Sequence, residues 1–591
     1  MPEPDKAPRD EKRLTNEEIA YTLHEIGELL DIQGESVFRV QAYDRAATAI
    51  RNLARDVADI YDEGGLKALQ TIPGVGKSTA LKIVEMLQTG KSSRLEELRK
   101  SLPPSLVAMS EIPGIGPKKI KRLYDELGVA TLEQLEGAAK AGRVRELRGM
   151  SAKTEENILK GIEAFRQHHE RILLYDAYPV AERVVTELSS SAAVERVDPA
   201  GSLRRFKETI GDIDILASSR KAEEVMEKFA TLPEVREVVA RGPTKSSVRT
   251  RAGLQVDLRV VTPDQYGAAL QYFTGSKAHN IHLRELAKKR NLKINEYGVF
   301  DVETDKRVAG ATEEEVYAQL GLPWIPPTLR EDKGEIEAAA EGRLPKLIQL
   351  EDVRGDLHVH TNWSDGSPKI DEVAEAAIEL GYEYVAITDH GYKLGITGGL
   401  EPSELERQIK ETEEVNRRYP RITILAGSEV SIDNEGKVDF DDDLLARLDI
   451  VNASIHAGFN QDRKQLTERT LAAIENPHVD IVCHPTGRLL GRRDAYDIDL
   501  DEVFKTAAKH KKVLELNAWP NRLDLKDDYL REAKSHGVRF AISTDSHRLE
   551  ELHFMFYGIV TAQRGWLGPD DAINTLPLDE LKRLLGIGDV G

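Results

Sequence analysis

The strongest constraint on the fold lies in the C-terminal part of the chain, where a series of apolar runs each ends in histidine or an acidic residue. Each run has the pattern of a buried strand. Segments with a helical pattern, such as 370–381 and 501–512, separate the runs. Alternating strands and helices predict a parallel sheet, and the carboxyl ends of parallel strands converge on one face of a barrel. The runs are DLHVH, YVAITDH, ITILAGSE, DIVNASIH, VDIVCH and RFAISTDSH.

The first of these runs places His358 and His360 one residue apart. Side chains two positions apart in a strand point to the same face, so two imidazoles would lie side by side, as metal ligands do. In isolation, this pair would be typical of a surface strand with two polar residues. The similar endings of the later runs favour a metal site instead, because histidines that merely pack in a core would be scattered along the strands.

Histidine, aspartate and glutamate ligands without thiolates suit zinc, manganese or iron, and the sequence does not select among them. The candidate ligands are too many for one ion. Two or three metals close together would bridge a phosphate, generate hydroxide and stabilise a leaving oxygen, which indicates phosphoester hydrolysis.

This set of motifs resembles the PHP (polymerase and histidinol phosphatase) domain over about residues 351 to 575. The resemblance implies a distorted βα barrel with a trinuclear metal cluster. Every ligand position of that pattern is filled in this sequence, so we expect an active site. The implied ligands are His358, His360, Asp365, His390, Glu429, His456, His484, Asp545 and His547.

The chain of 591 residues is long enough for several further cores beside this barrel. Its single cysteine, Cys483, excludes an internal disulfide framework and fits a reducing cytoplasm. Cys483 stands in an apolar run, so we expect a packed strand residue rather than a nucleophile. The polar N-terminus and the lack of a long apolar run predict a soluble, cytoplasmic protein.

The net charge of −20 is unevenly distributed along the chain. Residues 1–350 carry a net charge of about −3, and residues 351–591 about −17. Residues 241–290 sum to about +7. Such a basic run is often only a solvated surface, but it is also typical of contact with a phosphate backbone. The basic residues in this run include Arg241, Lys245, Arg249, Arg251, Arg284, Lys288, Lys289 and Arg290.

Two short segments in the N-terminal half repeat, TIPGVGKST at 71–79 and EIPGIGPKK at 111–119. Glycines between helical stretches permit a tight turn whose amides can hold a phosphate. A P-loop is excluded because Thr71 stands where that motif needs glycine. The repeats resemble the helix-hairpin-helix motif, which implies sequence-independent DNA contacts at Gly74, Gly76, Gly114 and Gly116. A degenerate third copy is expected at 147–158, with Gly149 in its turn.

The segment GSLRRFKETIGDID, residues 201–214, places Asp212 and Asp214 on one face of a predicted strand. Asp257 follows in another strand-like run. Carboxylates held together repel one another unless a divalent cation lies between them. With Gly201 and Ser202 before them, whose backbone and hydroxyl can hold a triphosphate, they predict a magnesium site for nucleotidyl transfer.

The substrate is indicated by YFTGSKAHN at 272–280, which is very similar to the nucleotide-binding segment of family-X DNA polymerases. The flanking DQYGAALQYFTGS and LKINEYGVF match the DNA polymerase β pattern, and the resemblance covers about residues 12–325. Together with the PHP pattern, it identifies a bacterial-type family-X DNA polymerase.

The resemblance implies roles for individual residues. Asp212 and Asp214 would bind both metals, and Asp257 would bind the catalytic metal and help to activate the primer 3'-hydroxyl. Ser202 and Arg205 would hold the β and γ phosphates, Tyr272 and Phe273 would discriminate sugars, and Asn280 and Arg284 would reach the nascent pair or template. The nucleotide-binding set is Gly201, Ser202, Arg205, Gly211, Tyr272, Phe273, Gly275, Lys277 and Asn280.

Two positions depart from the polymerase β pattern. Lys277 stands where the β-type enzymes have an acidic residue, so a cation is expected to contact the incoming nucleotide. Lys82 falls where the repair enzymes carry a Schiff-base lysine, whereas Ser78 replaces a second lysine of their 5'-phosphate pocket. Lyase activity at Lys82 and the role of an ordinary helix-surface lysine are both open.

The expected fold class is multidomain, with α-helical helix-hairpin-helix domains, an α+β nucleotidyltransferase palm with a thumb, and a C-terminal distorted (β/α) PHP barrel. The resemblance implies gap filling in DNA repair by a monomer acting on gapped or primer-template DNA and deoxynucleoside triphosphates, in the bacterial cytoplasm near the nucleoid. Mg²⁺ or Mn²⁺ would serve the palm, and two or three ions of Zn²⁺, Mn²⁺ or Fe²⁺ the barrel. The expected domains are 1–92 (lyase-like, helical), 93–170 (fingers-type, helical), 171–262 (palm), 263–325 (thumb), 326–350 (linker) and 351–591 (PHP).

The PHP resemblance further implies a metal-dependent 3'-5' exonuclease, with incision at abasic sites as an additional activity. Two alternatives stay open. The barrel could act on a small phosphomonoester, as histidinol phosphatases do, or the chain could serve chiefly as a DNA-binding scaffold with a silent polymerase. The complete set of Ser202, Asp212, Asp214 and Asp257 argues against the scaffold.

Overall fold

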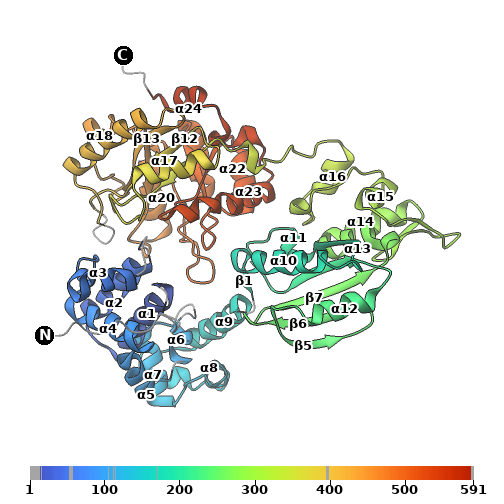
Figure 1. Cartoon of the computed structure of the whole chain (residues 1–591), viewed down its shortest axis with the longest axis horizontal. Helices are drawn as coiled ribbons and strands as arrows, with labels where there is room; N and C mark the ends of the chain where they lie inside the picture. Colours follow the sequence, from blue (N-terminus) through green and yellow to red (C-terminus); the bar gives the residue numbers. More distant parts are fainter. Residues whose placement is uncertain are drawn as a thin grey trace. The chain divides into compact units, whose positions relative to one another are not determined.

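The computed structural model describes residues 14, 16–51, 53, 57–103, 105–110, 112, 115–169, 171–393 and 398–587. One compact unit is formed by the described residues up to 169, and a larger one by most of those from 171 onwards. Figure 1 shows the elements of both. Each unit is described by itself.

The first unit is entirely helical among its described residues, and one apolar core runs through it. Its buried residues extend from Ile19 and Leu23 in the first helix to Ile158 and Ile162 in the last. The helices are α1 (Asn16–Gln33), α2 (Val37–Arg51), α3 (Val57–Leu69), α4 (Lys77–Thr89), α5 (Ser93–Ser101), α6 (Ser105–Ser110), α7 (Pro117–Leu127), α8 (Leu132–Lys140), the 3₁₀ turn η1 (Val144–Glu146) and α9 (Ala152–His169).

The same tight turn joins helices at three places in this unit. The amide of Val75 donates to Ile72, that of Ile115 to Ile112 and that of Met150 to Leu147, at 3.0 to 3.1 Å, and all six side chains are buried. Gly74 has φ 76°, and Gly149 has φ 78°, which glycine adopts without a Cβ clash. Gly76 and Gly116 are the N-caps of α4 and α7. Gly114 lies outside the described residues.

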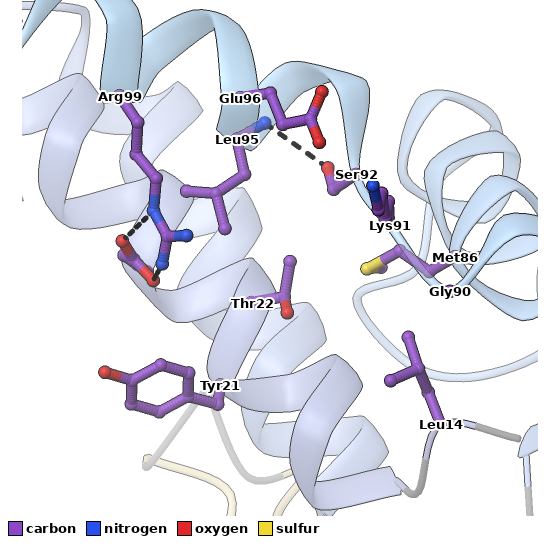
Figure 2. A pocket seen from close by; sticks show the side chains of 11 residues that line it. Leu14, Tyr21, Thr22, Met86, Gly90, Lys91, Ser92, Leu95, Glu96 and Arg99 are labelled. Carbon is purple, nitrogen blue, oxygen red and sulfur yellow. Dashed lines mark hydrogen bonds and ion pairs between the residues drawn. The ribbon is translucent and has the colours of Figure 1, made fainter. Parts of the chain in front are cut away.

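A pocket of about 470 Å³ lies in this unit, between α1 and the α4–α5 region (Figure 2). The Glu25 carboxylate on its wall forms a paired ion bridge with Arg99, at 2.7 and 2.8 Å. Among its described lining residues, which include Tyr21, Met86 and Leu95, none is a predicted site residue. This cavity is therefore separate from the predicted chemistry.

The palm is a five-stranded mixed sheet with the order β2-β4-β7-β6-β5. Its central pair, β4 and β7, is parallel, and the other neighbours are antiparallel. Apolar side chains of α10 (Leu174–Ser189) and α12 (Ala222–Ala230) pack against the sheet in one core. The strands are β2 (Arg196–Pro199), β4 (Ile213–Ser218), β5 (Val235–Arg241), β6 (Lys245–Thr250) and β7 (Gln255–Val261), with a small pair β1 (Ile172–Leu173) and β3 (Thr209–Ile210) beside them.

The thumb follows with α13 (Tyr266–Thr274), α14 (Lys277–Lys289), the antiparallel strands β8 (Leu292–Asn295), β9 (Gly298–Asp301) and β10 (Arg307–Ala309), and α15 (Glu313–Gln319). The segment predicted as a linker packs against it. Leu329 and Ile336 join the thumb core, and the Glu335 carboxylate of α16 (Glu335–Ala340) lies 2.6 Å from the Nδ1 atom of His279. Arg330 is fully buried and is paired with Glu313 at 2.5 Å.

Seven parallel strands in chain order form the C-terminal barrel, and helices surround them (Figure 1). A parallel bridge between Val359 and Ser546 connects the first strand to the chain that follows the last. The predicted fold class, including a nearly closed parallel barrel, is therefore confirmed. The strands are β11 (Gly355–Val359), β12 (Tyr384–Ile387), β13 (Thr423–Ser431), β14 (Ile450–Ser454), β15 (Ile481–Val482), β16 (Val513–Asn517) and β17 (Phe540–Ser543).

The helices around the barrel complete the alternation that the apolar runs predicted. Among the described helices of the whole chain, none combines the length and the apolar character needed to cross a membrane. The barrel helices are α17 (Ile370–Glu379), α18 (Pro402–Arg418), α19 (Asp442–Leu445), α20 (Arg463–Glu475), α21 (Leu500–His510), α22 (Asp527–Ser535), α23 (Met555–Arg564) and α24 (Leu578–Leu585).

Candidate active sites in the palm and in the barrel

The three predicted palm carboxylates lie together. Asp214 of β4 is in register with Asp257 of the parallel strand β7, and Asp212 precedes β4. Each of the three offers an oxygen, and these oxygens all lie within 4.8 Å of one another. The parallel neighbours β4 and β7 thus bring carboxylates that are far apart in the sequence together at one end of the central strands.

The electrostatics of this group call for a cation. Burial, together with the Asp212 and Asp257 carboxylates, raises the pKa of Asp214 to about 7. The Lys245 ammonium lies 3.0 Å from Asp257, and the Gln255 amide donates to Asp257 at 3.0 Å. Oxygen ligands of this kind suit Mg²⁺ or Mn²⁺, and a divalent ion would relieve the repulsion. The residues therefore fit the predicted metal.

Gly201 lies directly against Asp214. It has φ 61°, and a Cβ at this position would come within 2.1 Å of the Asp214 carboxylate, so no other residue fits. The amide of Ala200 donates to the Asp214 carbonyl at 2.8 Å, which fixes the short helix α11 (Gly201–Arg204) to β4. Ser202 lies in the first turn of α11. Gly211, one residue before Asp212, is exposed.

The turn between α13 and α14 holds the other predicted nucleotide-binding residues. The Asn280 amide donates to the carbonyls of Tyr272 and Gly275, at 2.7 and 3.1 Å, and accepts from Gln271 at 2.9 Å. The rings of Tyr272 and Phe273 meet edge to face at 5.1 Å. The hydrogen bonds of the Asn280 side chain thus hold the shape of this turn.

Phe273 also reaches the carboxylates. It lines a small cavity of about 40 Å³ together with Asp214, Lys245 and Asp257. The Arg259 guanidinium lies over its ring at 4.5 Å. The structure therefore brings the nucleotide-binding turn and the acidic group to one place.

Two neighbouring arginines connect α11 to the thumb. Arg204 forms two hydrogen bonds with Glu313, at 2.7 and 2.9 Å. Arg205 donates to the Thr274 carbonyl at 2.7 Å and to Glu331 at 2.9 Å, and only 11% of its side chain is exposed. The predicted phosphate ligand is therefore already held by a carboxylate.

The remaining predicted DNA and nucleotide contacts lie on the surface. Lys277 is exposed in the first turn of α14, and Arg284 is exposed farther along the same helix. Several members of the basic run are already paired. Arg241 lies 2.6 Å from Glu227, and Arg249 lies 3.3 Å from Glu237.

The barrel ligands lie in or just after the carboxyl-terminal ends of the strands. His358 is in β11, Glu429 is in β13, and the others follow strand ends in the loops. All but three of them are buried, and Asp365, His456 and His547 are half-buried. The structure brings together all nine predicted residues, which are His358, His360, Asp365, His390, Glu429, His456, His484, Asp545 and His547.

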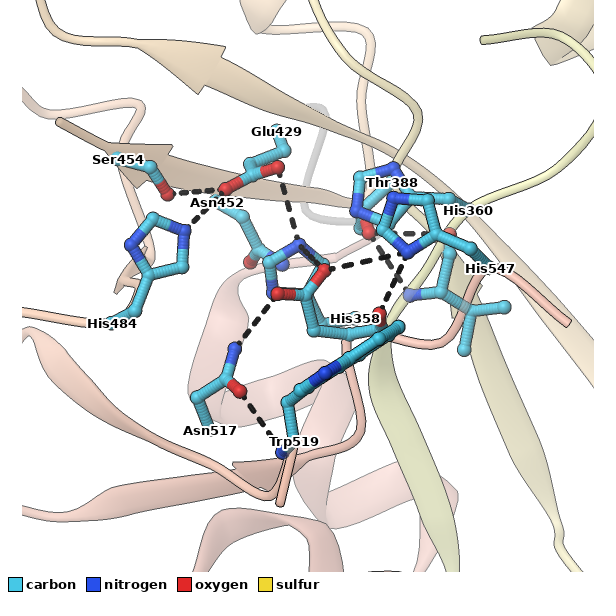
Figure 3. A network of polar contacts seen from close by, with 12 residues as sticks. His358, His360, Thr388, Glu429, Asn452, Ser454, His484, Asn517, Trp519 and His547 are labelled. Carbon is cyan, nitrogen blue, oxygen red and sulfur yellow. Dashed lines mark hydrogen bonds and ion pairs between the residues drawn. The ribbon is translucent and has the colours of Figure 1, made fainter. Parts of the chain in front are cut away.

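Glu429 contacts several imidazoles of this cluster, and Figure 3 shows it beside His358 and His484. Its two oxygens lie 2.9 Å from His390, 3.1 Å from His456 and 3.0 Å from His484. A fourth imidazole, that of His358, lies at 3.4 Å. Burial opposes ionisation, yet His456, His390 and His358 hold the pKa of Glu429 well below its usual range. It is thus an ionised carboxylate surrounded by imidazoles.

The ligand atoms form overlapping groups, within each of which all atoms lie inside 4.8 Å. Shared members, His360 and His390, link the groups, so ions bound to them would be close neighbours. Burial lowers the pKa of His456 to about 4, which keeps its imidazole in the neutral form that binds metals. The groups are His358–His360–Asp545, His360–Asp365–His390–His547 and His390–Glu429–His456.

Two cluster residues have an unusual backbone. His484 has φ 31°, and Asp545 has φ 56°, although neither is glycine. Residues in this region cost free energy and persist where the surrounding structure fixes them, often at functional sites. Both side chains face the cluster, which is consistent with a strained turn that aims a ligand.

Two residues that support the ligands were missed in the sequence. The buried Glu515 of β16 lies 2.7 Å from the Nδ1 atom of His358 and accepts from the His484 amide at 2.7 Å. Asn517 donates to Asp545 at 3.0 Å. The lone acidic residue in the apolar run VLELN could have indicated Glu515 as a supporting residue. Cys483 is buried beside His358 and Glu515, and burial raises the pKa of its thiol, in line with a packed strand residue.

Among the curated proteins that are similar to this chain is a relative that spans nearly all of it. It is "DNA polymerase/3'-5' exonuclease PolX" of Bacillus subtilis (strain 168), 40% identical over 97% of this chain and 99% of the relative. This chain belongs to the PolX family. The predicted resemblance to bacterial-type family-X DNA polymerases is therefore confirmed.

Family models of single domains match successive parts of this PolX chain. They are a helix-hairpin-helix domain at 14–92, a SAM-like helix-hairpin-helix tandem at 107–164, the DNA polymerase beta thumb at 269–331 and the PHP domain at 356–518. Rat DNA polymerase lambda is 25% identical over 54% of the chain and 56% of its own length. A probable phosphatase of Thermoanaerobacter sp. (strain X514) is 31% identical over 32% of the chain and 78% of its own length.

The predicted lyase lysine of this PolX chain is tied to its own helix. Lys82 donates to the hydroxyl and carbonyl of Ser78, at 3.0 and 3.2 Å, and lies 5.7 Å from the Tyr43 ring. Ser78, which stands where the repair enzymes have a second lysine, thus accepts a hydrogen bond from the Lys82 ammonium. Lyase activity stays a prediction.

Proposed function

We propose that this PolX chain fills short gaps in DNA by primer extension at the palm and shortens 3' ends at the barrel. The observation that carries both parts is the presence of two separate ligand clusters, one of carboxylates and one rich in histidine, in a single chain of this polymerase family. Deoxynucleoside triphosphates and DNA are the substrates of such an enzyme, and both clusters imply divalent metals.

At the palm, Asp212, Asp214 and Asp257 would hold Mg²⁺ or Mn²⁺, which when bound stabilises the charge of the transferred phosphoryl group. Ser202 and Arg205 would hold the triphosphate, and Asn280 keeps the turn of Tyr272 and Phe273 in shape. Asp257 would bind the catalytic metal and help to activate the primer 3'-hydroxyl. In-line attack then needs only positioning and charge stabilisation from these residues.

At the barrel, the nine-residue cluster would hold two or three ions of zinc, manganese or iron, which when bound supply hydroxide at neutral pH. Glu515 keeps His358 in one orientation, and Asn517 does the same for Asp545. The strongly acidic charge of residues 351–591 would disfavour duplex DNA near the barrel and admit a frayed 3' end. Incision at abasic sites is a further activity of this proposed centre.

The test is digestion of a 5'-labelled primer-template in manganese, without nucleotides, by the wild type, Asp212→Ala and His358→Ala. We expect a ladder of shortened primers with the wild type and Asp212→Ala, and intact primer with His358→Ala. Primer extension with nucleotides should show the opposite pattern. Intact DNA with an extending wild type would contradict a nuclease in the barrel.

One rival function has support from an observation. The barrel region is similar to a probable phosphatase, so its substrate could be a small phosphomonoester. Release of inorganic phosphate from such esters, with no shortening of DNA 3' ends, would favour this rival. The same His358→Ala variant serves as the control, because both reactions need the cluster.

The setting of the enzyme is also part of the proposal. A bacterial relative and a DNA substrate support a location at the nucleoid in the cytoplasm. The two helix-hairpin-helix regions and the small palm would suit gapped DNA as the substrate. We propose a monomer, which sedimentation of the purified chain with and without gapped DNA would test.

A further inference from the structure

The phosphate-binding arginine proposed for the palm is held by a carboxylate that it shares with the barrel. Arg205 donates through Nε to Glu331 at 2.9 Å. Arg564, the last residue of α23 in the barrel, donates to the same Glu331 oxygen at 3.1 Å. It also donates to the backbone carbonyl of Arg205 at 2.9 Å. One barrel side chain therefore touches both the backbone of the arginine and its counter-ion.

The surroundings leave Arg564 little freedom. Only 6% of its side chain is exposed, and its other terminal nitrogen lies 2.6 Å from Asp527 of α22. Burial opposes ionisation of Glu331, yet Arg205 and Arg564 keep its pKa below the usual value. Burial likewise opposes ionisation of Asp527, while Arg564 and Lys333 lower its pKa to about 2. Arg564 is thus a fixed cation between two ionised carboxylates.

Removal of Arg564 would strengthen the ion pair between Arg205 and Glu331. Among the described residues, the next cation near Glu331 is Lys207, whose ammonium lies 4.0 Å from the same oxygen. Glu331 would then be balanced mainly by Arg205, and a stronger pair with a carboxylate competes with a triphosphate for the same guanidinium. The Arg205 backbone would also lose the donor that fixes its carbonyl.

We propose that Arg564 of the barrel is a positioning residue for nucleotide binding at the palm, acting through Glu331 and Arg205. It shares the charge of Glu331 and anchors the Arg205 carbonyl, so that the Arg205 guanidinium stays available for the phosphates. The polymerase thus depends on the barrel for the affinity of its nucleotide, apart from any metal in the barrel. This inference rests on the proposed role of Arg205.

Arg564 lies in a contact that also has an ordinary packing role. Tyr557 and Val560 of α23 belong to the palm core, and the Phe556 ring lies 5.2 Å from Tyr178 and 5.7 Å from Phe206. A test must therefore separate positioning from packing. Arg531 of α22 offers the matched control, because it donates to the Lys333 carbonyl and stacks on Trp566, and among the described residues it forms no hydrogen bond with Glu331 or Arg205.

The experiment measures single-nucleotide incorporation by the full chain on a gapped primer-template, with kcat and KM for the nucleotide, beside exonuclease rate and melting temperature. For Arg564→Ala we expect KM to rise about tenfold, the scale of one lost hydrogen bond to a charged group, with kcat and nuclease rate within about twofold. Arg564→Lys should give a smaller rise, and Arg531→Ala should leave KM within about twofold.

A second substitution tests the route. In Glu331→Gln/Arg564→Ala the carboxylate is gone, so Arg205 is released and KM should return toward the wild-type value. An unchanged KM in Arg564→Ala, an equal rise in Arg531→Ala, or no recovery in the double variant would overturn the proposal. If Arg564→Ala does not fold, the same test uses Arg564→Lys, whose KM is measured with and without Glu331→Gln. Arg205→Ala tests the proposed role of Arg205 separately from that of Arg564. An unchanged KM in Arg205→Ala would show that Arg205 does not bind the phosphates.

Discussion

The two ligand clusters differ in burial and in chemistry. The palm group consists of three carboxylates, of which Asp212 is exposed, and lies at one end of the two central strands of a sheet. The barrel group is rich in imidazoles, is mostly buried, and has supporting side chains behind its ligands, such as Glu515. An exposed oxygen site suits ions that arrive with a nucleotide, whereas a buried nitrogen-rich site suits ions that stay bound. Breaking each site separately tests this difference.

The largest effect is expected at the palm, from Asp257→Ala. Loss of this carboxylate removes both a metal ligand and the group beside the primer hydroxyl, so primer extension should fall by about three orders of magnitude or more. Exonuclease activity should stay within about twofold. Extension and digestion of the same labelled primer measure both. An equal loss of both activities would show that the two sites are not independent.

The corresponding variant of the barrel is Glu429→Gln, which keeps the shape of the side chain but removes the charge at the centre of the cluster. Three imidazoles lie within about 3 Å of this carboxylate. We expect exonuclease activity to fall by about two to three orders of magnitude while extension is retained. A wild-type melting temperature would exclude misfolding. A nuclease that survives this change would place the hydrolytic reaction elsewhere.

A smaller effect is expected behind the ligands, from Glu515→Gln. The amide can still contact the His358 ring, but it loses the charge that favours one orientation. Replacing such a partner typically costs about 10- to 100-fold in metal affinity or activity. Titration of the exonuclease with manganese should show a higher metal requirement and recovery at high metal. A loss that high metal does not restore would argue against a role in metal binding.

The smallest effect is expected at the opposite ends of the barrel strands, from Asp480→Asn. Asp480 accepts from the Val451 amide at 2.9 Å, and burial raises its pKa from 3.8 to about 7. The folded state therefore retains a proton that the unfolded chain loses, so stability falls as pH rises from about 4 to 7. Asparagine does not titrate, so the variant should gain about 1–2 kcal/mol over the wild type above pH 7. Melting temperatures at pH 5.5 and 8 check this, and an equal difference at both would contradict it.

The sequence predicts most of the barrel cluster because most of its ligands end an apolar run, whereas Asp365 was implied only by the PHP resemblance. Asp545 and His547 follow RFAIST just as His390 follows YVAIT, so the rule for parallel strands brings them together without further information. The palm group could be predicted from the GS and DxD motifs and from Asp257 in a second strand-like run, but only the fold shows that β4 and β7 are parallel neighbours.

Side-chain partners across the chain could not be predicted in this way. Arg564 and Glu331 are separated by 233 positions, and no local period connects them. The segment 326–350 has the prolines and charges of a linker, yet Arg330 and Glu335 are fully buried because Glu313 and His279 pair with them. Charge near proline predicts a loop, and only the fold shows which carboxylate meets which arginine.

The bridge between Val359 and Ser546 has a consequence for the order in which the enzyme is made. A chain leaving the ribosome exposes His358 long before Asp545 and His547, whereas Asp212, Asp214 and Asp257 emerge close together. The hydrolytic centre can therefore assemble only when synthesis is nearly complete. Arg564 emerges later still, so a nascent chain has neither a complete nuclease nor the final support of its nucleotide pocket.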